Sequence, residues 1–514
     1  MTSATGHEPS DVATPVPPDV DVMSRDVRWF AHATGTSWPP PGHPEPAPER
    51  PDTHVAPALP EAARGRAGHP LPHGTSELLE RAPFPHGRPA APASPPAALG
   101  HALVTAFGLQ RREPENPFND HRPYPSVRAR FPVQAFVQDA HRATVLDLHR
   151  HALVGLGADP GGDGPAEPAA EVLLAGRYTR LPDSYRWFRG SLVHLEMGIA
   201  LRQLALGLEL FGLRGTVRLP GPATAPLLTA LGPGAEEEWS LPLSVGVDAA
   251  AFPAADPLPA PGPVPRDDAG APPHRVDPVL DETVALNRTQ EFDGPAEPLT
   301  SALPAGGPAS PLSWAEVLWR RSAGRMPRGM YGMSGRRRTV PAEVLAETAR
   351  WLAVPPPGPT LAEIAGAVRV TGVVQGVAGH RDGVHHLVDG RPVLVREDPG
   401  AAAELETHYG YRVDPYNGGD IRHATAVWFL SVRPRELVER FGRGAFTAAQ
   451  YVAGWQSQGI SLAAAAAGLY ARPARAFREI PSQRVLGLPA DEMVLCTVIT
   501  GTPRYRGLLC DLRI

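Results

Sequence analysis

The sequence that decides the fold begins Arg189-Gly190-Ser191-Leu192-Val193-His194-Leu195-Glu196-Met197-Gly198 and continues through an apolar run to Phe211-Gly212-Leu213. A second stretch has the same outline. It begins Ala448-Ala449-Gln450-Tyr451-Val452-Ala453-Gly454 and ends in Ala467-Gly468-Leu469. The two stretches repeat with a period of about 256 residues. Because both are apolar on all faces, we predict two long buried helices, at 190–210 and 448–469, packed against another layer such as each other.

Shorter elements are expected around these helices in both halves of the chain. In the first half we expect a helix at 97–109 and a strand at 134–138. The elements expected in the second half are helices at 315–320, 342–352 and 435–440 and strands near 368–374, 384–388, 424–430 and 493–499. The recurring pattern predicts two α+β domains fused in tandem.

Proline and glycine divide the chain into segments. Residues 1–26 are predicted to form a disordered tail, because proline and aspartate dominate them without periodicity. We place a first domain at 27–250 and a second at 312–514. Residues 251–311 form a Pro/Ala-rich linker with one ordered island at 279–288.

Composition excludes several functions. The 514 residues carry 49 basic and 54 acidic side chains, a net charge of −5, and every basic residue is arginine. The absence of lysine excludes Schiff-base, pyridoxal phosphate and P-loop chemistry. Neither half has the basic excess that nucleic-acid binding needs, and the longest apolar segments are too short to cross a membrane. Cys496 and Cys510 are too few for a disulfide framework, and the N-terminus lacks a signal-peptide pattern, so we expect a cytoplasmic protein.

Three arginine-containing segments are candidates for binding chemistry. The first, 319–325, places Arg320, Arg321, Ser322 and Arg325 where guanidinium groups and a hydroxyl can grip a phosphate. The second, 122–132, holds Ser126 in a proline-bounded turn before a strand, where hydroxyl and amides can face a planar ligand. The third, 501–506, follows the last strand and carries arginines at 504 and 506. The alternatives are a solvated helix end, an ordinary strand entry and a solvated tail.

Other catalytic patterns are missing from the sequence. His149 and His151, like His385 and His386, lack a third ligand at metal spacing, so we expect no metal site. The sequence contains no GxSxG elbow, HExxH helix or GxGxxG turn after a strand. Acyl-serine, zincin and dinucleotide functions therefore have little support.

These segments resemble the FMN-dependent nitroreductase superfamily, and within it the SagB-type or McbC-like azoline dehydrogenases of thiazole/oxazole-modified peptides, in the long tandem form used in thiopeptide biosynthesis. Arg320-Arg321-Ser322 resembles the opening Arg-Arg-Ser of that family, which implies a grip on the FMN phosphate and ribityl chain. The segment 124–132 resembles its Tyr-Pro-Ser-Ala-Gly-Ala-Leu-Tyr-Pro, which implies flavin contact by Ser126. The stretch 440–473 and Gly501-Thr502-Pro503 resemble its last helix and last strand, and Arg504 and Arg506 would close on the same phosphate.

The resemblance is divided between the halves. At the place of Arg-Arg-Ser the first half has Glu80-Arg81-Ala82-Pro83, and the second half has no clear Tyr-Pro-Ser segment. Family members are dimers whose flavins bind at the subunit interface. The resemblance therefore implies an intrachain pseudo-dimer with one composite site and about one FMN per chain.

The catalytic residue implied by the resemblance is Tyr185. Related enzymes use a Lys-Tyr pair before the long helix, and only the tyrosine survives here. A phenol whose pKa is lowered by Arg186 and Arg189 could exchange a proton with the ring Cα while flavin takes the hydride. Alternatively, Tyr185 packs at a helix start.

We therefore predict an FMN-dependent azoline dehydrogenase acting on a ribosomally made precursor peptide, with cyclodehydratase enzymes as partners. Two alternatives remain. One is a nitroreductase-like flavin oxidoreductase acting on a small molecule or a carrier-bound intermediate. The other is a flavin-free scaffold subunit that binds peptide and partner enzymes.

Overall fold

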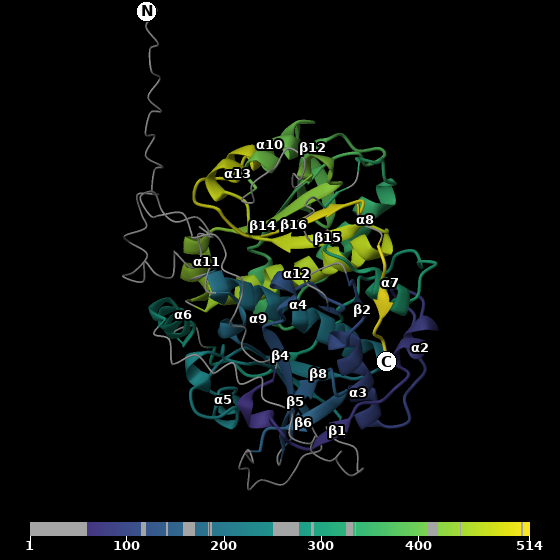
Figure 1. Cartoon of the computed structure of the whole chain (residues 1–514). Coiled ribbons are helices and arrows are strands. Elements are labelled where there is room, and N and C mark those ends of the chain that lie inside the picture. The colour runs from purple at the N-terminus through teal and green to yellow at the C-terminus, as the bar shows by residue number, and fades with distance from the viewer. Residues whose placement is uncertain are drawn as a thin grey trace, which may run out of the picture.

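The computed structural model describes residues 59–514, except for 115–119, 140–141, 158–169, 183–184, 186–187, 250–276, 289–291, 325–332, 335, 410–419, 443 and 505–506. It has two lobes, one for each half of the chain, each built on an antiparallel sheet (Figure 1). The long helices α4 (Phe188–Leu210) and α12 (Ala445–Ala466) lie between the lobes. This confirms the predicted mixed architecture of two α+β units.

The first sheet has eight strands in the order β1-β6-β5-β4-β7-β9-β8-β10. Their bounds are β1 Gly68–Pro70, β4 Val133–Gln138, β5 Ala143–Asp147, β6 Ala152–Gly155, β7 Ala170–Gly176, β8 Gly215–Arg218, β9 Leu243–Val247 and β10 Glu297–Pro298. The helices of this half are η1 Glu61–Ala63, α2 Thr75–Glu80, α3 Pro95–Phe107, η2 Val127–Ala129, η3 Tyr178–Arg180, α4, α5 Pro226–Ala230, η5 Ala235–Glu237 and α6 Pro278–Arg288.

The second sheet has six strands in the order β13-β12-β11-β14-β16-β15. Their bounds are β11 Arg369–Val374, β12 Gly383–Val388, β13 Arg391–Glu397, β14 Ala426–Val432, β15 Tyr470–Ala474 and β16 Met493–Gly501. The helices are α7 Trp314–Arg320, α8 Ala342–Leu352, α9 Pro359–Ala365, α10 Ala401–Thr407, η6 Ile421–His423, α11 Pro434–Phe441, α12 and α13 Glu479–Leu486. The helices and strands expected in this half are present, within about three residues of their predicted bounds.

The two long helices cross at paired glycines. A Cβ on Gly198 would lie 2.0 Å from the carbonyl oxygen of Tyr451, and a Cβ on Gly454 would lie 2.1 Å from that of Leu195. The two contacts are equivalent, because Gly454 and Tyr451 lie 256 residues after Gly198 and Leu195. The two helices are therefore related by a pseudo-two-fold axis. Any larger residue at either position would force the backbones apart, so the glycines fix this close approach.

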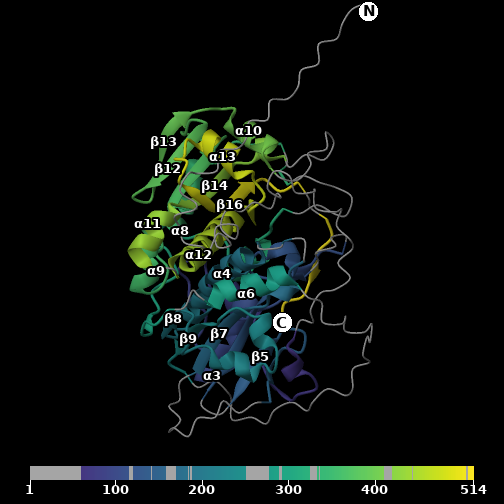
Figure 2. The same ribbon diagram turned by 90° about the vertical axis from the view of Figure 1, so that its left-hand side faces the viewer.

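Two further segments tie the halves together. The C-terminal strand β17 (Cys510–Asp511) pairs with β2 (Arg111–Arg112), which pairs with β3 (Asp120–His121). The C-terminus of the chain therefore lies beside the first lobe (Figure 2). Inside the predicted linker the structure has α6 and the edge strand β10, so 277–288 and 292–311 pack with the lobes rather than only connecting them. Pro298 is tolerated because an edge strand leaves one side without ladder bonds.

Among the described residues, no helix is long and apolar enough to cross a membrane. The predicted tail at 1–26 and the start of the first domain, 27–58, lie outside the described residues.

Candidate functional site

The turn between β3 and β4 is held in an unusual backbone conformation. Arg128, Ala129 and Phe131 have φ of 49°, 52° and 48°, a left-handed region that non-glycine residues seldom adopt. The hydroxyl of Ser126 accepts a hydrogen bond from the Phe131 amide at 2.8 Å, and Arg180 Nε donates to the Arg130 carbonyl at 2.9 Å. Arg128 adopts this conformation although the left-handed region favours glycine. Strained residues of this kind persist only where surrounding contacts hold them, and they cluster at functional sites.

Ser126 also contacts a buried carboxyl group on α4. Its hydroxyl donates to Glu196 Oε2 at 2.6 Å, and Glu196 is only 2% exposed. Burial raises the pKa of Glu196 to about 7, although the Ser126 hydrogen bond, Arg122, the Val133 amide and Arg180 all favour the charged form. Glu196 could not be recognised as a site residue from its pattern, because it lies within the apolar run of α4.

Tyr185, between η3 and α4, contacts this turn. Its phenol oxygen accepts a hydrogen bond from Arg128 Nε at 3.1 Å, and the Arg128 guanidinium carbon lies 5.4 Å from the centre of the ring. Two arginines are expected from the sequence to lower the pKa of Tyr185. Arg189 is buried and instead pairs with Asp277 at 2.8 Å. Arg186 lies outside the described residues. Among the described residues, Arg128 therefore lies beside the phenol.

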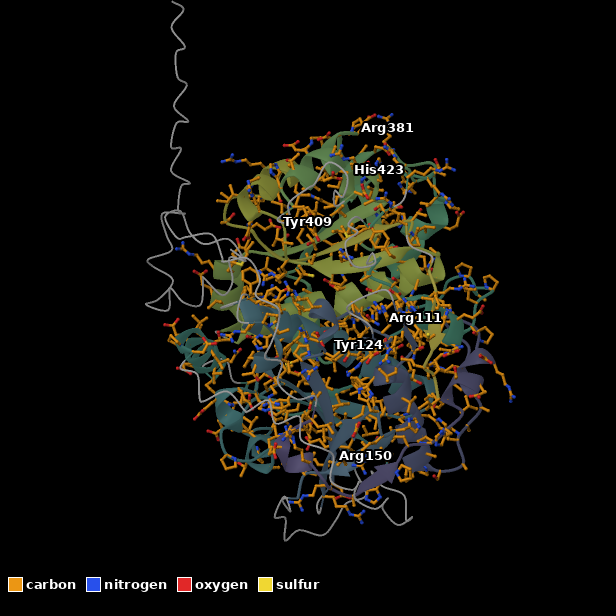
Figure 3. The ribbon with its side chains drawn as sticks, in the orientation of Figure 1. Arg111, Tyr124, Arg150, Arg381, Tyr409 and His423 are labelled. Atoms are coloured by element: carbon orange, nitrogen blue, oxygen red, sulfur yellow. The ribbon has the colours of Figure 1, made fainter. Side chains whose placement is uncertain are left out.

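Arg321 comes to this turn from the other half of the chain. It follows the last residue of α7, is only 3% exposed, and its Nε donates to the Arg122 carbonyl at 3.2 Å. Arg111 Nη1 donates to the carbonyls of Trp319 and Arg321, the latter at 3.0 Å. Figure 3 shows Arg111 and Tyr124 where the two lobes meet. The loop after α7 and the turn of Ser126 therefore lie against each other, as a composite site requires.

Of the remaining predicted residues, Ser322 lies beside the start of β15. The Ser322 carbonyl accepts from the Ala471 amide at 2.9 Å, and its hydroxyl accepts from the Gly324 amide at 3.1 Å. Arg320 is half-exposed and pairs with Glu316 at 3.5 Å, on the outer side of this loop. Arg504 follows β16 and pairs with Asp420 at 3.0 Å. Arg325 and Arg506 lie outside the described residues.

The charged groups gathered between the lobes are mainly cationic. They include Arg111, Arg122, Arg180 and Arg321, with Glu113 and Glu196 as carboxyl groups. Burial and the positive charge of Arg111 together lower the pKa of Arg321 to about 9, while Glu113 opposes the shift. In the described part of the chain, Arg122 Nε is buried without a hydrogen-bond partner. Buried cations in excess are costly unless an anion compensates them, so this donor set fits an anionic ligand such as a phosphate or a reduced flavin ring.

The pseudo-two-fold axis relates the composite site to a second position in the chain, and the two positions hold different side chains. In the composite site, Gln458 Nε2 donates to the Pro123 carbonyl at 3.2 Å. Its counterpart 256 residues earlier is Arg202, which is fully buried between the rings of Trp351 and Trp455, each 5.1 Å away. Arg202 donates to the carbonyls of both tryptophans at 3.0 Å. A planar cation and two indoles therefore lie where the pseudosymmetry places the counterpart of Gln458.

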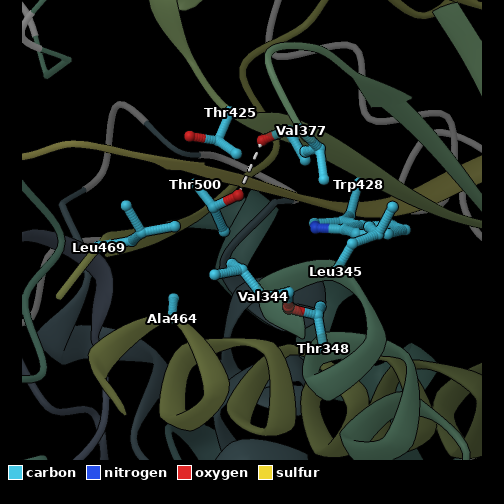
Figure 4. Close-up of a pocket in the computed structure, with 10 residues that line it drawn as sticks. Val344, Leu345, Thr348, Val377, Thr425, Trp428, Ala464, Leu469 and Thr500 are labelled. Atoms are coloured by element: carbon cyan, nitrogen blue, oxygen red, sulfur yellow. Dashed lines mark hydrogen bonds between the residues drawn. The ribbon is translucent and has the colours of Figure 1, made fainter. Parts of the chain in front are cut away.

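A small cavity lies elsewhere, between α8, α12 and the second sheet (Figure 4). Its lining is mostly apolar and includes Leu345, Val377, Trp428 and Leu469. It has room for little more than one water molecule. It is too small to hold a planar cofactor.

No protein-family model matches the sequence, and no curated protein matches it significantly. Solved structures do match in three dimensions. A protein from Anabaena variabilis described as a nitroreductase superposes with a TM-score of 0.56 at 14% sequence identity, over 79% of this chain and 89% of its own. The chain has the nitroreductase fold. The fold spans most of the chain and so includes both halves, which confirms the predicted tandem nitroreductase-like architecture.

Two other solved structures overlap smaller parts of this nitroreductase fold. A nitroreductase from Ralstonia eutropha is 17% identical, with a TM-score of 0.29 over 40% of this chain and 90% of its own. A chain of the E. coli microcin synthetase complex McbBCD, solved with truncated pro-MccB17 bound, is 13% identical, with a TM-score of 0.27 over 35% and 70%. Both TM-scores are too low for these two matches to support an inference about this chain.

Proposed function

We propose that this chain is an FMN-dependent oxidoreductase that converts thiazoline or oxazoline rings to azoles in a ribosomally made peptide. The observation that carries the proposal is the contact between Arg321 and the carbonyl of Arg122. It joins the two segments that resemble flavin-binding segments, one from each half. Neither half carries both segments, so only the fused chain can form the site.

The residues present fit FMN. Arg321 and Ser322 would hold the phosphate and ribityl chain, with Arg320 and Arg504 at the edge of the loop. Ser126, in its strained turn, would face the ring from the other half. Bound FMN would supply the hydride acceptor of the reaction.

The chain's own chemical contribution would be a proton acceptor for the ring Cα, and Tyr185 is the candidate. Its phenol lies beside a guanidinium group, which stabilises a phenolate. The lysine of related enzymes is absent, so Arg128 would supply the positive charge without being able to accept a proton.

The contents of the second position support one flavin per chain. Arg202 is tied there by three backbone carbonyls, those of Trp351, Trp455 and Ala302. In the described part of the chain no carboxylate pairs with it, and burial lowers its pKa to about 9. A second flavin ring would have to displace this buried guanidinium group from between two indoles.

Purified protein is expected to be yellow and to convert a thiazoline-containing peptide to the thiazole with loss of two hydrogens, measured by mass spectrometry. The matched control is the same peptide incubated with heat-denatured protein. Two outcomes contradict the proposal. Yellow protein that leaves azolines unchanged but reduces nitroaromatics indicates a small-molecule oxidoreductase, and colourless protein that does not take up FMN indicates a scaffold.

A further inference from the structure

Glu196 is an ionisable group without a counterpart in the other half. It lies on α4, on which most residues are buried, and the position 256 residues later is Val452. A carboxyl group inside an apolar helix is costly unless it is hydrogen-bonded or protonated. Because this buried carboxyl group lies beside the composite site, Glu196 is a candidate for a role in ligand binding.

The proton of the Ser126 hydroxyl is already used in a hydrogen bond. The hydroxyl accepts from the Phe131 amide and donates its proton to Glu196 Oε2. A serine hydroxyl has one proton and two lone pairs. While Glu196 is ionised, Ser126 can therefore accept a further hydrogen bond but cannot donate one to a ligand.

Several groups face the Glu196 carboxyl. Arg122 begins the turn between β3 and β4, Arg180 comes from η3, and the Val133 amide comes from β4. The buried phenol of Tyr124 also lies close enough for the Glu196 charge to raise its pKa. In the described part of the chain, the second carboxyl oxygen, Oε1, is buried without a hydrogen-bond partner, a position that the protonated form tolerates better than the charged form.

We propose that Glu196 is a positioning residue whose protonation state sets the direction of the Ser126 hydroxyl. When Glu196 is ionised, Ser126 donates to it. When Glu196 is protonated, its own O–H donates to Ser126 Oγ, and the Ser126 proton becomes available to a ligand between the lobes. The inference rests on the proposed function in one respect, namely that this ligand is FMN.

The direction of the pH dependence follows. Burial places the pKa of Glu196 at about 7, so the carboxyl is protonated below that pH and ionised above it. FMN should therefore bind more tightly below pH 7. One net hydrogen bond corresponds to a change of roughly two- to tenfold in the dissociation constant.

The test measures the FMN dissociation constant by flavin fluorescence between about pH 5.5 and 9. Wild-type protein should lose affinity as the pH rises through about 7. Glu196→Gln should bind at all pH values like the wild type at low pH, because its amide always donates to Ser126. Ser126→Ala should bind weakly without this pH dependence. Glu209→Gln, the same change farther along α4 where Glu209 pairs with Arg88, should keep the wild-type profile.

A second readout does not involve flavin. Infrared spectra of flavin-free protein should show a protonated-carboxyl band that disappears as the pH rises through about 7 and that Glu196→Gln lacks. The comparison with the variant is needed because burial also raises the pKa of Glu479, to about 8.

The outcomes separate the two proposals. If FMN binds and the profiles of wild type and Glu196→Gln are the same, the role of Glu196 is overturned and the proposed function stands. If FMN does not bind at any pH, the proposed function fails and the inference fails with it, even if the infrared band titrates as expected. If Glu196→Gln does not fold, Ser126→Ala decides, because a wild-type pH dependence in that variant overturns the inference.

Discussion

Replacing Arg321 by alanine is expected to weaken FMN binding by about ten- to a hundredfold, the effect of losing a charge-assisted contact to a phosphate. Arg321 is buried at the start of the loop after α7, and its Nε donates to the turn of the other half. Arg321→Lys should give an intermediate affinity, because lysine keeps the charge but loses the fork geometry. The dissociation constants can be measured by flavin fluorescence, with circular dichroism as the check of folding.

The matched control for Arg321 is Arg338→Ala. Arg338 belongs to the exposed cluster Arg336-Arg337-Arg338 and lies outside the composite site. Its removal should leave the affinity unchanged. If the Arg321→Ala protein folds and binds FMN as tightly as the wild type, Arg321 does not bind the FMN phosphate.

The second large effect is expected from Tyr185→Phe, which should lower kcat for azoline oxidation by about a hundred- to ten-thousandfold. Phenylalanine keeps the ring beneath the Arg128 guanidinium but removes the oxygen that accepts from Arg128 Nε. Flavin content and folding should therefore remain, while the proton acceptor is lost. The measurement is turnover of a thiazoline peptide at saturating FMN.

Tyr409→Phe is the control for Tyr185. Tyr409 lies in the second lobe, where its ring packs 5.0 Å from that of Phe477 (Figure 3). Its replacement should leave kcat unchanged. Full activity of the Tyr185→Phe protein would refute the catalytic role and favour simple packing of Tyr185 at the helix start.

Much of the fold could be predicted because its pattern is local. Helix α8 occupies Ala342–Leu352 as expected, since Pro341 precedes it and its apolar residues recur with helical spacing. The two long helices could be recognised from their apolar runs and Gly-Leu ends. The strands β2 and β17 could not, because each has only two residues and they pair with each other although they lie far apart in the sequence.

The candidate site could be predicted only in part. Arg321 and the turn of Ser126 carry a recognisable pattern, but their contact is set by how the halves pack. Glu196 and Arg202 were missed because both lie within apolar helical runs that indicate burial and nothing more. The signal that could have found them is the charge itself, since a charged residue in a buried helix needs a partner.

The ratio of bound flavin to protein tests the central claim most directly. A composite site formed by Arg321 and Ser126, with Arg202 filling the pseudosymmetric position, predicts about one FMN per chain in protein saturated with FMN, from flavin absorbance and amino-acid analysis. A ratio near two would show that both positions bind flavin and would contradict the account.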